Sequence, residues 1–146
     1  MTRAAQIYQF RLFLEEVRPL VWRRIQVPAD YTLTRLHKVV QAVMDWQDYH
    51  LHEFTIAGRA YGPPDPEAEQ QVLDERSVQL RDLDLSLGDQ LQYVYDFGDN
   101  WQHVLEFEKA LTRGTEAVYP VCVGGECSTP PEDWSVGVRG VSWGAF

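Results

Sequence analysis

Two histidines in the stretch His50-Leu51-His52-Glu53 form the densest grouping of side chains that can do chemistry. Alternate residues of a strand point to the same face, so His50 and His52 would lie side by side, where both imidazoles can bind one metal ion. Glu53 would face the other way unless a bulge intervenes. Because histidine titrates near neutral pH, these residues could also serve general acid–base catalysis.

A second segment, residues 95–103, supplies further groups of the same kind in Asp96, Asp99 and His103. Both segments fall at expected strand ends or turns, and we therefore expect them to lie close together. Imidazoles and carboxylates combined would form a mixed nitrogen and oxygen site suited to a divalent metal such as Zn, Mn or Fe. Glu53 and Glu132 are the candidate catalytic bases, and no organic cofactor is indicated.

The alternative is that these residues only fix turns. Asp96 and Asp99 would accept backbone N–H bonds across a hairpin, and the histidines would be hydrogen-bonded at a sheet edge. His37 lies beside an apolar stripe of the expected helix, and we expect it to pack there rather than bind a metal. Cys122 and Cys127 lack a third cysteine nearby, so we expect two thiols without zinc, because structural zinc needs four ligands.

The charge of the chain is −9 overall and is unevenly distributed. Residues 1–60 carry eight Lys or Arg against six Asp or Glu, whereas residues 61–146 carry five against sixteen. An acidic protein repels a phosphate backbone, so nucleic-acid binding is disfavoured for the chain as a whole. The first half still offers a candidate basic surface, for which the alternative is a set of solvated charges: Arg18, Arg23, Arg24, Arg35 and Lys38.

Composition predicts a cytoplasmic protein. Hydrophobic residues make up 45% and charged residues 24%, as in ordinary globular proteins. No apolar run approaches the ~20 residues that a membrane span needs. The first residues lack the apolar region of a secretory signal, so we expect reduced cysteines and no membrane contact.

The elements that must position these groups follow from apolar periodicity. Thr32 is the expected N-cap of the principal helix, whose apolar stripe begins at Leu33. The pattern predicts an α+β fold, a mostly antiparallel sheet of hairpins with one helix packed on it. The expected elements are strands at 6–14, 20–27, 51–58, near 78–80, 90–96 and 101–109, a helix at about 33–46, and a long surface loop at 62–76. The expected core is Trp22, Leu33, Leu36, Val40, Val43, Phe54, Leu91, Tyr93 and Leu105.

Several stretches, in their order and spacing, resemble the plasmid pRiA4b ORF-3-like family. The most specific are Tyr-Asp-Phe-Gly-Asp-x-Trp-x-His at residues 95–103 and Pro-Pro-Glu-Asp at residues 130–133. The resemblance implies a small prokaryotic α+β protein, here a single domain over 1–133, from a family with members on plasmids or insertion elements. Some members are labelled transposon passengers or resolvase-like, but this chain shows no serine-recombinase motif and no helix-turn-helix.

The sequence departs from the family pattern after Asp133, where similar proteins continue with Cys-Gly-Gly. Residues 135–140 can be encoded so that a shift of one nucleotide yields Cys-Gly-Gly-Ala-Trp-Gly. We therefore predict that residues 134–146 are an irregular tail, frameshifted or truncated, and the alternative is a natural divergent end. Loss of the usual segment would expose apolar surface and favour a homodimer.

Three functions fit these observations. Strong catalytic motifs such as Gly-x-Ser-x-Gly, a phosphate-binding loop or His-Glu-x-x-His are absent, whereas Trp and Tyr are abundant. This combination favours a module that binds a protein or small-molecule partner, in a family associated with mobile elements. The second hypothesis is a metal-dependent hydrolase or nuclease that uses the His and Asp cluster. The third is nucleic-acid binding through the basic half.

Overall fold

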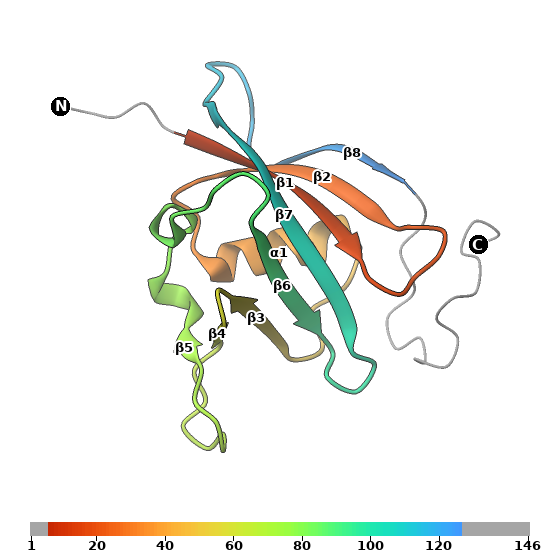
Figure 1. Cartoon of the computed structure of the whole chain (residues 1–146), viewed down its shortest axis with the longest axis vertical. Coiled ribbons are helices and arrows are strands. Elements are labelled where there is room, and N and C mark those ends of the chain that lie inside the picture. Colours follow the sequence, from red (N-terminus) through yellow and green to blue (C-terminus); the bar gives the residue numbers. More distant parts are fainter. Residues whose placement is uncertain (1–5, 127–146) are drawn as a thin grey trace.

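The computed structural model describes residues 6–126, in which one eight-stranded sheet carries α1 against one of its faces (Figure 1). Two short 3-10 helices, η1 (Glu75–Ser77) and η2 (Leu80–Leu83), follow β5. The other elements are β1 (Gln6–Leu14), β2 (Trp22–Pro28), α1 (Leu33–Val43), β3 (His52–Ile56), β4 (Arg59–Gly62), β5 (Leu73–Asp74), β6 (Gln90–Tyr95), β7 (Trp101–Thr112) and β8 (Val121–Glu126).

The strand order is β5-β4-β3-β6-β7-β1-β2-β8, and the sheet is mixed. Strands β4 and β5 run parallel, and three further pairings join strands far apart in the sequence: β1 with β7, β2 with β8, and β3 with β6. The prediction of a mostly antiparallel sheet of hairpins is therefore wrong. Each hairpin leaves unpaired N–H and C=O groups along its two outer edges. These groups are hydrogen-bonded to strands from distant parts of the sequence.

The single principal helix is confirmed among the described residues. The hydroxyl of Thr32 caps it by accepting a hydrogen bond from the backbone N–H of Arg35 at 3.2 Å. The helix ends at Val43 rather than near residue 46, because Asp45 adopts a left-handed backbone with φ of 56°. The chain then turns back toward the sheet, with the N–H of Trp46 bonded to the carbonyl of Gln41 at 2.9 Å.

The core lies between α1 and the facing side of the sheet. Seven of the nine expected core residues are fully buried, whereas Trp22 and Val43 are only half-buried. Strand β1 matches its predicted span, and its alternate residues from Tyr8 to Leu14 enter the core. Strands β4, β5 and β8 were not predicted, and the expected strand near 78–80 is an isolated bridge between Thr32 and Gln79.

None of the helices within residues 6–126 is both long and apolar enough to cross a lipid bilayer. Cys127, the candidate base Glu132 and the predicted abnormal tail at 134–146 lie outside the described residues.

Candidate functional site

The two segments with the predicted metal ligands lie together, as expected. His52 is paired with Tyr95 in the register of β3 and β6, and Nε2 of His50 lies 3.5 Å from Oδ2 of Asp96. The segments meet because the N–H of Asp96 donates to the carbonyl of Leu51 at 2.8 Å, which extends the β3–β6 pairing.

Within this region, Asp96 and His103 are held by the backbone around them. Oδ1 of Asp96 accepts from the N–H groups of Gly98 and Asp99 at 3.1 and 3.3 Å, which fixes the β6–β7 turn. The buried ring of His103 lies with Nδ1 2.9 Å from the carbonyl oxygen of Trp101, so Nδ1 is the donor. These contacts agree with the alternative to metal binding, in which Asp96 and His103 only stabilise the turn.

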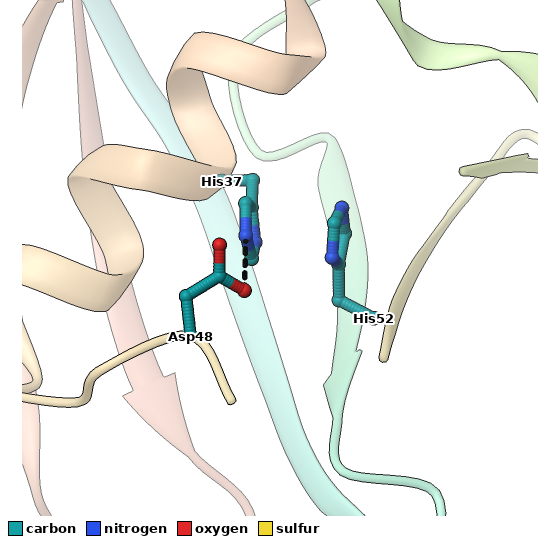
Figure 2. Close-up of side chains that lie close together, drawn as sticks. All are labelled: His37, Asp48 and His52. Carbon is teal, nitrogen blue, oxygen red and sulfur yellow. Dashed lines mark ion pairs between the residues drawn. The ribbon is translucent and has the colours of Figure 1, made fainter. Parts of the chain in front are cut away.

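His52 instead points under α1, where it meets two residues outside the predicted set (Figure 2). His37 projects from α1, and Asp48 comes from the turn that follows the helix. The rings of His37 and His52 stack with their centroids 3.4 Å apart and an interplanar angle of 10°. One ligand atom from each of the three residues lies within 4.8 Å of the other two. We call these three residues the histidine cluster.

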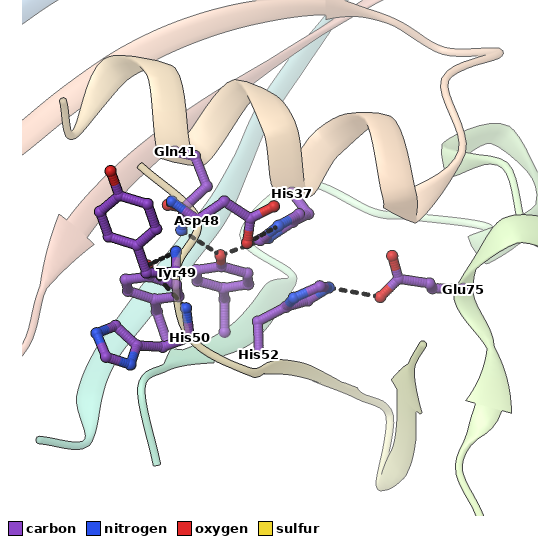
Figure 3. Close-up of polar contacts among 9 residues, drawn as sticks. His37, Gln41, Asp48, Tyr49, His50, His52 and Glu75 are labelled. Carbon is purple, nitrogen blue, oxygen red and sulfur yellow. Dashed lines mark hydrogen bonds and ion pairs between the residues drawn. The ribbon is translucent and has the colours of Figure 1, made fainter. Parts of the chain in front are cut away.

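A closed ring of polar contacts, three hydrogen bonds and one ion-pair contact, fixes one side of the histidine cluster (Figure 3). The amide of Gln41 donates to the hydroxyl oxygen of Tyr93 at 3.0 Å, and that hydroxyl donates to Nδ1 of His37 at 2.6 Å. Nε2 of His37 lies 2.9 Å from Oδ1 of Asp48, and the backbone N–H of Asp48 donates to Oε1 of Gln41 at 2.9 Å. Because a carboxylate only accepts, Nε2 of His37 is the protonated nitrogen in this arrangement.

The other side of the cluster is fixed by Glu75 at the start of η1. Its Oε1 lies 2.6 Å from Nε2 of His52, and both residues are buried. Burial alone would raise the pKa of Glu75, but the hydrogen bond and charge of His52, with the hydroxyl of Thr34, outweigh it and lower that pKa. Glu75 is therefore an ionised acceptor that holds His52 in place.

Burial is also the largest influence on the pKa values of His37 and Tyr93. It lowers the pKa of His37, and the adjacent His52 ring lowers it further, against the opposing effect of Asp48. Burial also raises the pKa of Tyr93 well above its usual value, so the phenol remains protonated and able to donate. His37 is thus a neutral imidazole at pH 7, the form that can bind a metal.

A pocket of 420 Å³ lies beside this site, at the start of β3. Its walls come from three segments: Leu51, His52 and Glu53, the loop between β4 and β5, and Phe97 of the β6–β7 turn. Glu53, the described candidate base, is half-buried and lies on the opposite face of β3 from His52, since successive side chains alternate. The structure thus separates Glu53 from the histidine cluster.

Sequence reasoning missed His37, Asp48 and Glu75 as members of the site. His37 was expected to pack on the helix, and it does lie buried there, but both nitrogens of its ring lie beside polar groups, the hydroxyl of Tyr93 and the carboxylate of Asp48. The available signal was a histidine on the apolar face of a helix, one turn from Leu33. Glu75 carried no signal, because its role depends on where η1 docks.

The five basic residues do not share one face. Arg23 and Arg24 are successive residues of β2, so they point to opposite sides of the sheet. Arg24 pairs with a glutamate of β7 at 2.8 Å, whereas Arg23 and Arg18 donate to main-chain carbonyl groups. Arg35 and Lys38 both lie on the exposed side of α1, where they line a pocket of 240 Å³.

The fold is thus one helix packed on an eight-stranded mixed sheet, with buried histidines between the helix and the sheet. The family model described as plasmid pRiA4b ORF-3-like protein matches residues 6–142. The chain therefore belongs to the plasmid pRiA4b ORF-3-like family, which confirms the resemblance seen in the sequence. The match continues past Asp133, where the departure from the family pattern was expected to begin.

Two relatives have no assigned activity in their names. The chain is 37% identical over 131 residues to the uncharacterized protein y4hQ of Sinorhizobium fredii (strain NBRC 101917 / NGR234), covering 88% of this chain and 66% of that protein. It is similar in structure to the protein of unknown function MM3350 from Methanosarcina mazei Go1, with a TM-score of 0.82 and 39% identity, over 90% of this chain and 75% of the other. The chain thus spans just under two thirds of y4hQ.

Proposed function

We propose that this protein is a binding module whose pocket beside β3 takes an apolar side chain of a partner protein, from a segment that also carries positive charge. The observation that supports this proposal is the composition of the 420 Å³ pocket, which combines exposed apolar side chains with carboxylates. Pockets of this size that are mainly apolar, with a few polar groups, are typical ligand sites.

The apolar part of the pocket comes from two side chains that solvent reaches freely. Leu51 is 65% exposed and Phe97 is 52% exposed, and the hydrogen bond between Leu51 and Asp96 holds their segments together. Pro63, Pro64 and Val72 continue the wall. A single exposed apolar residue needs no explanation, but several around one hollow indicate a surface that a partner covers.

The charge around the pocket selects the kind of partner. Glu53 and Asp65 line it, and the exposed Glu67 and Glu69 follow in the same loop. Opposite charges on two binding surfaces raise the association rate and disfavour the wrong partners. A partner segment with lysine or arginine next to an apolar side chain therefore fits better than an acidic segment or nucleic acid.

Short peptides test this proposal. We expect peptides with one Phe or Leu flanked by lysines to bind in fluorescence anisotropy, more weakly as salt rises, whereas peptides with glutamates in place of lysines should not bind. Phe97→Ala should weaken binding by about tenfold, equivalent to about 1.4 kcal/mol. Leu87→Ala is the matched control, because Leu87 is 79% exposed and does not line the pocket.

Equal binding of lysine and glutamate peptides would contradict the proposed charge selection. Equal loss of binding in Phe97→Ala and Leu87→Ala would place the binding surface elsewhere.

The partner's membership of a mobile-element system is a further part of the proposal. It is supported by the plasmid in the family's description and is checked by the genes adjacent to family members.

The second candidate function, metal-dependent hydrolysis, is favoured by one observation. The histidine cluster places two imidazoles and a carboxylate within reach of one ion. Three protein ligands with an open position are the usual arrangement at catalytic zinc. This candidate requires metal binding, whereas the peptide-binding proposal does not.

A further inference from the structure

We propose that His37, Asp48 and His52 form a binding site for a divalent transition-metal ion of the zinc class. The site shares His52 with the wall of the peptide-binding pocket but needs no bound peptide, and it differs from the ligand set that the sequence predicted. Its ligand atoms lie within 4.8 Å of one another, and they come from α1, from the turn after α1 and from β3.

The chemistry of the donors selects the ion. Two imidazole nitrogens and one carboxylate oxygen suit Zn²⁺, Fe²⁺ or Mn²⁺, whereas Ca²⁺ and Mg²⁺ prefer oxygen ligands throughout. Burying ionisable groups is unfavourable unless they are paired, and the side chains of His37 and His52 are only 3% and 8% exposed. The fold holds two imidazoles in contact at this depth, where Glu75, Asp48 and Tyr93 pair them.

Neighbouring residues hold the remaining nitrogen of each ring. Glu75 occupies Nε2 of His52, which leaves Nδ1 as the donor atom of that ring. The hydroxyl of Tyr93 occupies Nδ1 of His37, which leaves Nε2, the atom already beside Asp48. Histidines that bind metals usually have their other ring nitrogen held in this way by a carboxylate or another polar group.

Metal binding would require a limited rearrangement. With ligands at ~2.1 Å, a tetrahedral ion holds its ligand atoms about 3.4 Å apart, so the cluster must contract by at most about 1.4 Å from its 4.8 Å limit. The two rings must also leave their 10° stack, because imidazole lone pairs lie in the ring planes and parallel rings cannot both point at one ion. Tyr93 adapts to this change, since a hydroxyl can accept from His37 as well as donate.

The ion can enter from the side of Asp48. The side chain of Asp48 is 46% exposed, in contrast to the two rings. Its backbone has a φ of 58°, a left-handed conformation that asparagine adopts readily. Asp48→Asn therefore removes the charge of the ligand and leaves the turn intact, which makes it the sharpest variant for a test.

The test is equilibrium dialysis of the full chain against Zn²⁺, with the bound metal measured by elemental analysis, and Co²⁺ used as a visible-absorption probe. We expect one bound Zn²⁺ per wild-type chain, a higher Tm with Zn²⁺ than without, and Co²⁺ bands characteristic of bound nitrogen ligands. Asp48→Asn should weaken binding by about tenfold or more, and His52→Gln should abolish it. His50→Gln is the matched control and should bind as the wild type does.

Absence of saturable Zn²⁺ binding by the wild type would overturn the proposal. Wild-type affinity in both Asp48→Asn and His52→Gln would also overturn it, as would loss of binding in His50→Gln. If His52→Gln fails to fold by near-ultraviolet circular dichroism, Asp48→Asn decides the question alone. Peptide binding is measured separately, and its failure leaves this result unchanged.

Discussion

At the scale of single residues, the hydroxyl of Tyr93 connects the helix to the sheet. It lies on β6 and contacts both Gln41 and His37 of α1. Tyr93 is fully buried, so water cannot replace either hydrogen bond. A buried polar group that loses its partner costs about 1–3 kcal/mol, more than the net gain from an average hydrogen bond.

Tyr93→Phe should therefore destabilise the protein by about 1–3 kcal/mol, because it leaves Nδ1 of His37 and the amide of Gln41 without their shared partner. Urea denaturation followed by far-ultraviolet circular dichroism measures the effect. Tyr49→Phe is the control, since Tyr49 is 75% exposed, and its change should stay within about 0.5 kcal/mol. Equal stability of the two variants would mean that the hydroxyl of Tyr93 has no structural role.

At the scale of elements, α1 and the turn after it determine where the histidine cluster forms. Leu33, Leu36 and Val40 anchor the helix on the sheet, and all three are fully buried. The left-handed residues Asp45 and Asp48, with φ of 56° and 58°, then reverse the chain, and the N–H of Asp48 reaches Gln41. The helix thus supplies His37 directly and positions Asp48 through the turn.

Leu36→Ala should lower the free energy of unfolding by about 2–4 kcal/mol, because it leaves a cavity between α1 and the sheet. Lys38→Ala is the control on the exposed side of the same helix, where the expected change is within about 0.5 kcal/mol. Chemical denaturation compares the two variants. If Leu36→Ala were as stable as Lys38→Ala, the assignment of the buried helix face would be wrong.

At the scale of the whole molecule, the sheet ties both halves of the chain together. Strand β1 lies between β2 and β7, and β3 lies between β4 and β6, so early strands pair with late ones. Neither half of residues 6–126 can bury its strand edges alone. This interleaving also brings Glu75, which lies well after β3, beside His52.

We expect a single cooperative unfolding transition. Tryptophan fluorescence reports on the buried Trp46 and Trp101, and far-ultraviolet circular dichroism reports on the sheet. The two signals should give the same denaturation midpoint and the same slope, because early strands of the sheet are paired with late ones. Separate midpoints would show that the part of the chain on one side of β1 unfolds independently of the rest.

Local periodicity determined much of the secondary structure from sequence alone. The alternation of β1 gave its observed span, Gln6–Leu14, and a polar residue before an apolar stripe identified Thr32 as the N-cap. Strand β8 could not be found in this way, because Gly124 and Gly125 show no alternation. The need for glycine in β8 comes from its packing against β2. A Cβ on Gly125 would lie 2.8 Å from the backbone oxygen of Trp22, so only glycine permits this close approach.

The sequence by itself also determined the family, because the distinctive motifs are short and each lies within one segment. It predicted that His50 lies near Asp96, because both segments fall at expected strand ends or turns. Only the tertiary structure decided the order of the strands and the partners of His52. Alternation shows which residues of a strand share a face, but it does not show which strands become neighbours. The stack of His37 on His52 and the contact with Glu75 depend on that order and on how α1 and η1 dock.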